Sequence, residues 1–316
     1  MKVSIVVPVY NEVESVPHLH RAIREAMAGR DHEVVYVDDG STDGSVEALE
    51  RLIQQDGGLS RLVVLRRNFG QTAALAAGID HSVGEVLVTL DADMQNDPAD
   101  IPLLIGKIEE GYDLVSGWRI KRKDSFLRRI PSQAANWLIS RVTGVPLHDY
   151  GCTLKAYRRE VLEGFHLYGE MHRFIPAYAG GVGARIVEVP VRHHPRRYGK
   201  AKYGLERTLK VVLDLFTVKF LTSYAAKPIY LFGGIGLGLI ATSLVTLLAL
   251  VVRRITLGEH MIRSPLLLMS TMLFILGAQS ILMGLIAELM VRTYHESQAK
   301  PTYSVRRVVD PAHGSK

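Results

Sequence analysis

The chain has 316 residues, a formal net charge of +6, and 47% hydrophobic and 22% charged residues, a globular composition with room for one large domain or two ordinary ones. Its single cysteine, Cys152, excludes an internal disulfide framework and indicates a reducing compartment for the main domain. Charge is unevenly distributed, because roughly the first two thirds mix charged and apolar residues while the last third holds two long uncharged segments.

The N-terminal part of the chain alternates predicted strands and helices. Apolar, β-rich runs predict the strands, and amphipathic, small-residue or capped stretches predict the helices between them. In chain order the predictions are strand 2–10, helix 15–28, strand 33–40, helix 43–56, strand 61–67, helix 71–84, strand 85–93, helix 98–111 and strand 112–119. This alternation predicts an α/β fold with a mostly parallel sheet and helices on both faces.

Three polar motifs directly follow predicted strands. They are "PVYNE" at 8–12, "VDDGSTD" at 37–43 and "LDADMQ" at 90–95. In open α/β sheets, ligands bind beyond the carboxyl ends of the strands. The sequence therefore predicts one binding site at that edge, to which all three motifs contribute.

The third motif carries closely spaced carboxylates. Asp91 and Asp93 point the same way along an extended backbone, so both could reach one cation. Carboxylates, waters and phosphate oxygens are the usual ligands of Mg²⁺ and Mn²⁺, and such a metal neutralises charge that grows on a leaving phosphate. A surface turn is the alternative, because "DADMQNDP" is also good turn chemistry. Asp97, ahead of Pro98, is expected to cap a helix.

The second motif places Asp38, Asp39 and Asp43 after a strand. Carboxylates there can accept hydrogen bonds from a base N–H or a ribose hydroxyl. The alternative is an N-cap of the next helix by Ser41 or Asp43, and both interpretations can hold together.

Two basic segments lie further along the chain. Residues 119–143 begin with "RIKRKDSFLRR" and continue as an amphipathic stretch, which fits either a solvated face or proximity to anionic head groups and a lipid phosphate. Around Gly199, "HHPRRYGKAKYG" is either a flexible loop that holds phosphate or a basic linker beside a membrane. Its cations are Arg196, Arg197, Lys200 and Lys202.

The last third of the chain predicts a membrane anchor. Residues 201–227 form an amphipathic stretch that fits a helix in the membrane interface or an ordinary core-facing helix. Segments 228–252 and 264–287 each exceed the ~20 apolar residues needed to cross a bilayer, and predict two transmembrane helices followed by a tail, 288–316.

Glycines and basic residues add two expectations about this anchor. The run "GGIGLG" lacks the G-x-G-x-x-G spacing of a nucleotide loop, whereas Gly234 and Gly238 fit a helix-packing face that would permit a homo-oligomer. By the positive-inside rule, the arginines in the loop 253–263 favour a cytoplasmic loop, whereas the basic residues outside both spans favour cytoplasmic termini. Because the large N-terminal domain has no export signal, we expect both termini in the cytoplasm.

Together these motifs resemble a known family. The runs "VVPVYNE", "VDDGSTD", "LDADMQ", "DYGCTLKAYRR", "FIP" and "RRYGKAKYG", followed by two spans, resemble the family 2 glycosyltransferases that load sugars onto polyprenyl phosphates. That group includes dolichyl-phosphate mannose synthase, the bactoprenol glucosyltransferases and the undecaprenyl-phosphate 4-deoxy-4-formamido-L-arabinose transferase. The resemblance covers nearly the whole chain and implies a GT-A fold, a Rossmann-like nucleotide-sugar domain, over residues 1–200.

The resemblance also implies site residues. Asp91, Ala92 and Asp93 would meet the diphosphate and a Mg²⁺ or Mn²⁺ ion, and Gln95 the metal or the sugar. Asp149 would lie beside the acceptor, where it is sometimes cast as a base. The nucleotide pocket would be lined by Pro8, Tyr10, Glu12, Val37 and Asp39, and the loop closing on the diphosphate would carry Arg196 and Lys202, with Ala201 where the family pattern has Ser.

The implied reaction is inverting transfer of a sugar from a nucleotide diphospho-sugar, UDP-linked, to undecaprenyl or another polyprenyl phosphate at the cytoplasmic membrane face, for cell-envelope glycan or lipid A modification. We expect no nucleic-acid partner. The acceptor phosphate is already mostly ionised, with a second pKa of ~6 in analogous monoesters. Positioning and charge should therefore matter more than a strong base, which favours Asp93 over Asp149 as the more important carboxylate.

Two other functions remain open from the sequence. A processive polysaccharide synthase shares the Asp-x-Asp pattern, but it usually has more spans and a Gln-x-x-Arg-Trp motif, which is absent from this sequence. A membrane scaffold with a degenerate domain is the other, and the intact "DAD" and the basic loop argue against it.

Overall fold

The computed structural model describes residues 1–120, 136, 139–141, 143–163, 167, 171–195, 228–257, 264–297 and 303–310. The chain divides into two compact units. One comprises residues 1–218 with 301–316, and the other comprises residues 219–300. The predicted interfacial stretch 201–227 and most of the basic segment 119–143 lie outside the described residues.

The first unit is built on an eight-stranded sheet with the order β7-β5-β6-β4-β1-β2-β3-β8. Neighbouring strands β4, β1, β2 and β3 are parallel, as are β5 and β7, whereas β6 runs antiparallel between β4 and β5. The prediction of a mostly parallel sheet is therefore confirmed. The strands are β1 (Val3–Val9), β2 (His32–Asp38), β3 (Ser60–Leu65), β4 (Val86–Thr89), β5 (Leu114–Trp118), β6 (Lys155–Arg158), β7 (Ile186–Pro190) and β8 (Val305–Val309).

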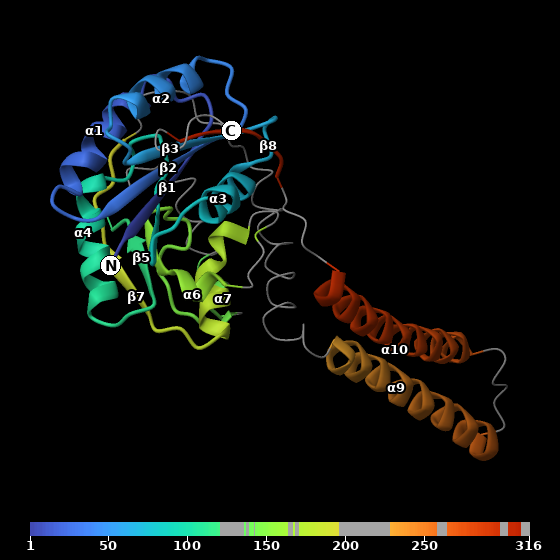
Figure 1. The fold of residues 1–316 in the computed structure, drawn as a ribbon. Coiled ribbons are helices and arrows are strands. Elements are labelled where there is room, and N and C mark those ends of the chain that lie inside the picture. Colours follow the sequence, from blue (N-terminus) through green and yellow to red (C-terminus); the bar gives the residue numbers. More distant parts are fainter. Residues whose placement is uncertain are drawn as a thin grey trace. The chain divides into compact units, whose positions relative to one another are not determined.

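Helices cover both faces of this sheet (Figure 1). Apolar residues of α1, α2 and α4 pack on one face, and α3 packs on the other against β2 and β3. Burial on both faces explains why β2 is buried at every residue. The helices are α1 (Val16–Ala26), α2 (Ser45–Gln54), α3 (Gln71–Asp80), η1 (Pro98–Asp100), α4 (Ile101–Glu109), α6 (Arg159–Leu162), η2 (Met171–Arg173) and α7 (Ile175–Gly181).

The small side chains of α3, whose sequence is "QTAALAAGID", let this helix pack closely on the sheet. A Cβ on Gly78 would lie 2.2 Å from Val6 Cγ1, so a larger side chain would push the helix off β1. The small residues thus set the height of α3 above the strands. This height matters because the N-terminal residues of α3, Gln71 and Thr72, reach the polar edge of the sheet.

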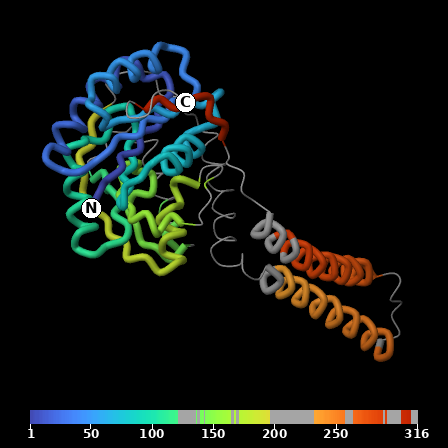
Figure 2. Tube along the Cα trace, in the orientation of Figure 1, coloured from blue at the N-terminus to red at the C-terminus, as the bar shows by residue number. Residues whose placement is uncertain are grey.

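The C-terminal strand β8 was not predicted, because residues 288–316 were expected to form a tail. It pairs antiparallel with the edge strand β3, and Figure 2 shows this red segment beside the blue strands. Tyr303 donates a hydrogen bond of 2.7 Å to Asp80 Oδ2, and Arg307 forms an ion pair with Glu50. The chain that follows the second apolar helix therefore completes the sheet and covers its β3 edge.

The second unit is a pair of long helices, α9 (Pro228–Leu257) and α10 (Pro265–Ser297). Within them, Phe232–Thr256 and Pro265–Ala287 are long and apolar enough to cross a membrane, by length and composition. Their backbones meet at Gly236 and Gly277, where a Cβ on either would lie 2.6–2.7 Å from the other's carbonyl oxygen. Ser243 and Ser270 add reciprocal hydrogen bonds to each other's carbonyl oxygens at 2.7 and 2.9 Å.

Within the chain, the glycine of α9 that packs on α10 is Gly236. Gly234 and Gly238 have no atom within 4 Å of a Cβ position, so the packing face that we expected of them, between protomers, stays a prediction. The sequence pattern could not decide between these faces, because glycines two residues apart lie on different sides of a helix.

Strand β8 generates a stability prediction. Val308 packs against the cluster formed with α3, so Val308→Asp should lower the free energy of unfolding by about 1–3 kcal/mol by placing a carboxylate against apolar side chains. Arg306→Ser, at an exposed position of the same strand, should change it by less than ~0.5 kcal/mol. Thermal unfolding of the detergent-solubilised full chain measures both, and equal effects would show that β8 does not stabilise the sheet.

Candidate active site

The first two sequence motifs meet at the carboxyl ends of β1 and β2. Asn11 N donates to Ser41 Oγ at 2.9 Å, and Thr42 N donates back to Asn11 Oδ1 at 2.8 Å. Glu12 N donates to Ser45 Oγ at 3.0 Å. The loops after these strands are thus joined by reciprocal hydrogen bonds, as a shared site requires.

Two residues of the motifs adopt a left-handed backbone conformation. Asn11 has φ of 51° and Met94 has φ of 58°, and among the described residues they are the only non-glycine positions with positive φ. Such conformations are uncommon and cluster at functional sites. At Met94 the turn brings Gln95 N to 3.1 Å from Asp93 Oδ1, to which it donates a hydrogen bond.

Asp39 holds the loop between β3 and α3. Its Oδ1 accepts from Phe69 N at 2.7 Å and its Oδ2 from Gly70 N at 2.9 Å. Burial raises the pKa of this carboxyl group, although the hydrogen bonds from the two amides act to lower it. At the neighbouring Gly40, φ is 75° and a Cβ would lie 2.7 Å from Arg67 C, so the close approach of the loops needs glycine. Contact between Asp39 and a nucleotide base stays a prediction.

The other aspartates of this motif, Asp38 and Asp43, also accept hydrogen bonds from backbone amides. Both oxygens of Asp38 accept from Ser41 N, at 3.1 and 3.0 Å, and burial raises the pKa of Asp38. Asp43 accepts from Ser45 N, the first residue of α2, and from Val13 N. The alternative of helix capping thus holds for Asp43, although the N-cap position itself is Gly44.

The predicted nucleotide-pocket residues do not all reach the surface. Val37 is 0% exposed and its side chain packs beneath α3, in the core, so its contact with a nucleotide stays a prediction. Ala92 is also buried, and its side chain packs with the apolar cluster of the sheet. Tyr10 is exposed, Pro8 is half-buried and Glu12 is buried. The sequence pattern identified the strand ends but not which side chains face solvent there.

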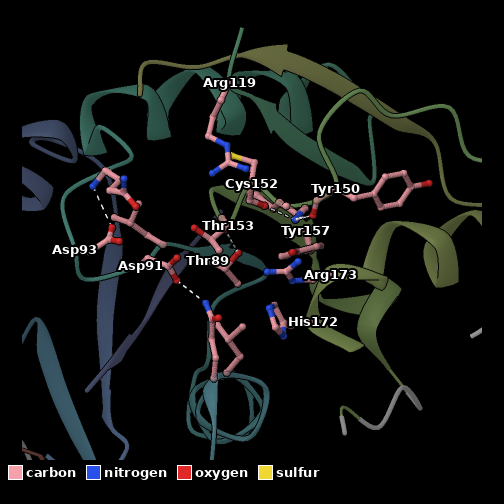
Figure 3. Close-up of a pocket in the computed structure, with 16 residues that line it drawn as sticks. Thr89, Asp91, Asp93, Arg119, Tyr150, Cys152, Thr153, Tyr157, His172 and Arg173 are labelled. Carbon is pink, nitrogen blue, oxygen red and sulfur yellow. Dashed lines mark hydrogen bonds between the residues drawn. The ribbon is translucent and has the colours of Figure 1, made fainter. Parts of the chain in front are cut away.

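The third motif opens into a cavity of about 240 Å³ with walls of opposite charge (Figure 3). Asp91 and Asp93 lie on one side, and Arg119 and Arg173 approach from others. Lys155 also lines it. Small-molecule sites usually measure about 300–1,000 Å³, so this cavity suits part of a larger ligand.

The acidic wall fits a hard divalent cation. Asp91 Oδ1 accepts from Gln71 Nε2 at 2.7 Å, and Asp93 is buried, with Gln95 beside it in the lining. In the part of the chain that the structure describes, no three His, Cys, Asp or Glu side chains gather in a metal-binding cluster. Two carboxylates match Mg²⁺ or Mn²⁺ whose other ligands come from substrate phosphates and water.

Arg119 is held by Asp149. Its Nε donates to Asp149 Oδ2 at 2.7 Å and its Nη2 to Oδ1 at 2.9 Å, in a bidentate pair whose side chains are 13% and 3% exposed. The sequence cast Asp149 as a possible base. Because a guanidinium engages both its oxygens, the geometry favours a role in orienting Arg119.

Lys155 is a buried cation that no pattern in the sequence predicted. It is 3% exposed, and its Nζ donates to the carbonyl oxygens of Tyr150, at 3.2 Å, and Cys152. Burial lowers the pKa of Lys155 to about 8. Lys155 thus fixes the loop that follows Asp149, and its charge titrates close to neutral pH.

His172 and Arg173 complete the cavity from η2. His172 is 6% exposed, and its Nδ1 lies 2.7 Å from Thr72 Oγ1. Arg173 directly precedes the "FIP" motif, which was the one signal in the sequence that pointed to this region. Arg196 and Lys202, which we expected to close on a diphosphate, lie outside the described residues.

Asp97, the first aspartate after the third motif, caps a helix. Asp97 is the N-cap of η1, and its Oδ1 accepts from Ala99 N at 3.0 Å. Asp97 is therefore a structural cap, as predicted, whereas Asp91, Asp93 and Gln95 line the cavity.

Comparison with known sequences gives a consistent family. The family model described as "Glycosyl transferase family 2" matches residues 4–165. The chain is 45% identical to the dodecaprenyl-phosphate galacturonate synthase of Rhizobium johnstonii, over 98% of this chain and 94% of that protein. It is 39% identical to the undecaprenyl-phosphate 4-deoxy-4-formamido-L-arabinose transferase of Klebsiella pneumoniae subsp. pneumoniae, over 98% and 94% of the two chains. The protein of the same name from Pseudomonas aeruginosa is 40% identical over 97% and 90%.

Solved structures share the fold of the sheet unit. One is glucosyl-3-phosphoglycerate synthase from Mycobacterium tuberculosis in complex with Mn²⁺, uridine diphosphate and phosphoglyceric acid. It matches with a TM-score of 0.53 and 18% identity, over 70% of this chain and 78% of that one. A second mycobacterial protein matches with a TM-score of 0.54 and 19% identity, over 70% and 74%. At this identity the likeness concerns the fold.

The Arg119–Asp149 pair generates a prediction about stability. Removing one partner of a buried ion pair leaves the other charge buried, so Asp149→Ala should lower the free energy of unfolding by about 3 kcal/mol or more. Glu109→Ala breaks the exposed pair with Arg30, at 3.3 Å, and should cost less than ~1 kcal/mol. Urea unfolding of the full chain compares the two variants. A loss at Asp149 as small as that at Glu109 would mean that the pair is not a buried, coupled one.

Proposed function

The chain belongs to glycosyl transferase family 2, and from that premise we propose that it transfers a sugar from a UDP-linked donor to undecaprenyl phosphate or a closely related polyprenyl phosphate. It is an enzyme with a GT-A-like core. The transfer inverts the anomeric carbon, takes place at the cytoplasmic face of the membrane and serves cell-envelope glycan or lipid A modification.

The observation that carries this proposal is the cavity with walls of opposite charge. A glycosyl transfer between phosphates must hold two anions close together, the diphosphate of the donor and the phosphate of the acceptor. The acidic wall, Asp91 and Asp93, suits a cation that binds the diphosphate, whereas Arg119, Lys155 and Arg173 suit anions directly. Both kinds of contact line the same cavity, next to the left-handed turn at Met94.

Asp91, Asp93 and Gln95 would hold a Mg²⁺ or Mn²⁺ ion. When bound, that ion neutralises charge on the departing diphosphate. Gln71 orients Asp91 through the hydrogen bond to its Oδ1, and Gln95 N orients Asp93. Arg196 and Lys202 are proposed to approach the same diphosphate from the other side.

Arg119 is proposed to place the acceptor phosphate for attack on the anomeric carbon. Its bidentate bond to Asp149 fixes the plane of the guanidinium before any ligand arrives. The attacking phosphate oxygen is already ionised near neutral pH, so no protein group has to remove a proton from it. The bond between the anomeric carbon and the phosphate oxygen forms as the bond to the diphosphate breaks, and UDP leaves.

The two apolar helices are proposed to span the membrane with both termini in the cytoplasm. The described span windows expose most of their apolar side chains, with 17% and 11% of the residues buried. Exposed apolar surface on this scale is unfavourable in water and favourable in lipid. An anchored enzyme can meet a lipid-linked phosphate without extracting its tail from the bilayer.

A donor screen tests the function directly. The full chain in detergent or vesicles is incubated with undecaprenyl phosphate, Mg²⁺ or Mn²⁺, and a set of UDP- and GDP-sugars. We expect release of one nucleotide, dependent on the lipid phosphate, with a single sugar on the product. Release without lipid phosphate, or a product with several sugars, would contradict the proposal, and the latter would indicate a processive synthase.

The two carboxylates of the site should differ in importance. Asp93→Ala should lower transfer by at least about 100-fold, because it removes charge that holds the diphosphate and metal. Asp149→Asn keeps the shape of the side chain and should leave measurable transfer. Equal and complete loss in both variants, with UDP binding preserved, would contradict this ranking of the two carboxylates.

Lys155 should set an alkaline limit on activity. Above about pH 8 the free enzyme loses the Lys155 charge, so kcat/KM should fall, by roughly tenfold per pH unit well above that pKa. Burial raises the pKa of Cys152 to about 11 and that of Tyr150 to about 12, so neither titrates in this range. Lys155→Arg should move the limit beyond pH 10, and an unchanged profile would assign it to another group.

A further inference from the structure

Glu188 of β7 is a largely covered carboxylate that has no task in the transfer as derived above. Strand β7 is the parallel neighbour of β5, and Glu188 lies opposite Ser116 in their register. The next residue after β5 is Arg119, which the transfer does use. The side chain of Glu188 is 10% exposed, and a carboxylate so far removed from water needs hydrogen-bond partners.

The partners of Glu188 belong to the turn that carries Asp149. Glu188 Oε1 accepts from Asp149 N at 2.9 Å and from His148 N at 3.0 Å. Glu188 Oε2 accepts from His148 N at 3.0 Å and lies 2.8 Å from His148 Nδ1. Two consecutive backbone amides thus point at one carboxylate, which fixes the backbone from which the Asp149 side chain extends.

The same turn is also held by the end of β5. The His148 ring stacks on Trp118, with the ring centroids 4.3 Å apart and the planes at 16°. The next residue, Arg119, donates from its backbone N to Asp149 Oδ2 at 3.4 Å, in addition to the bidentate bonds of its side chain. Residues of two neighbouring strands, β5 and β7, therefore fix the turn.

A carboxylate can hold a guanidinium in one plane only when the carboxylate itself is fixed. The bidentate pair sets the position of Arg119 relative to Asp149, and the two amide bonds set the position of Asp149 relative to the sheet. This matters for transfer, because a displacement of about 1 Å at a reacting group can lower a rate about 100-fold.

We propose that Glu188 is a positioning residue for the acceptor phosphate; this rests on the proposed function of Arg119. Glu188 fixes the backbone of Asp149, Asp149 fixes the guanidinium of Arg119, and Arg119 places the phosphate for attack on the anomeric carbon. Glu188 acts through these two residues, and in this role it takes no part in bond making or proton transfer.

The test separates lipid kinetics from donor binding in the full chain. With the UDP-sugar that the donor screen identifies, Glu188→Ala should lower kcat/KM for undecaprenyl phosphate by about tenfold to hundredfold, because Arg119 loses its fixed position. The affinity for UDP should stay within about twofold, because UDP is proposed to meet the Asp91–Asp93 side of the cavity.

Conservative variants separate position from charge. Glu188→Gln should keep kcat/KM within about threefold of the wild type, because its Oε1 can accept from both amides while its Nε2 donates to His148 Nδ1. Glu188→Asp keeps the charge but is shorter by one methylene, so it should lower kcat/KM by at least about fivefold. Glu110→Ala, which removes the exposed pair with Lys107 on α4, is the matched glutamate control and should change neither measurement.

A double-mutant cycle shows whether Glu188 acts through Arg119. In the Arg119→Gln background, Glu188→Ala should lower kcat/KM further by less than about threefold, because the group that it positions is gone. A general loss of stability would instead multiply with the effect of Arg119→Gln.

The outcomes distinguish this role from the proposed function. Three results would each overturn the positioning role and leave a glycosyltransferase: an equal loss of UDP affinity in Glu188→Ala, a full further loss in the Arg119→Gln background, and a Glu188→Gln variant less active than Glu188→Asp. A wild-type chain that shows no lipid-dependent transfer from any sugar nucleotide would overturn the proposed function and this role with it.

Discussion

The active site depends on charged groups of both signs that are held in fixed positions around one cavity. Four of them have hydrogen-bond partners within the sheet unit: Gln71 for Asp91, the Gln95 amide for Asp93, Asp149 for Arg119, and two backbone carbonyls for Lys155. These partners fix the positions of the charged groups, so that the charge of a ligand can complete the site.

The order of the strands makes this arrangement possible. Strand β6 runs antiparallel between β4 and β5, and its register places Lys155 directly opposite Thr89, two residues before Asp91. A slip of one residue would turn Lys155 to the other face of the sheet. The height of α3, set by its small side chains, then brings Gln71 and Thr72 to the same edge. The distance between the acidic and cationic walls is therefore a property of the sheet and not of a mobile loop.

Sequence patterns could predict the parts of this arrangement that are local. The strands and helices up to Trp118 follow from apolar periodicity, and the motifs at the strand ends follow from the rule that ligands bind there. Lys155, His172 and Arg173 were missed because they reach the cavity only through long-range pairing of short elements. The short strand β8 was missed for the same reason, because its partner β3 lies far away in the sequence. The burial of the Val37 side chain could not be predicted, because a motif identifies a strand end and does not say which side chain is buried.

The ionised state of a phosphate acceptor explains why such a site can do without a conspicuous base. A hydroxyl acceptor would need a carboxylate or histidine placed to remove its proton. The bidentate pair with Arg119 engages both oxygens of Asp149 and does not suit that task. A phosphate acceptor needs cations in fixed positions, and fixing a guanidinium needs a buried carboxylate behind it. On the proposed mechanism the same requirement would apply to Lys155, whose burial lowers its pKa to about 8 and which places a positive charge in the lining of the cavity. Burial of Asp149 and Lys155 would then serve a chemistry that works by placing charge, in which moving a proton has little part.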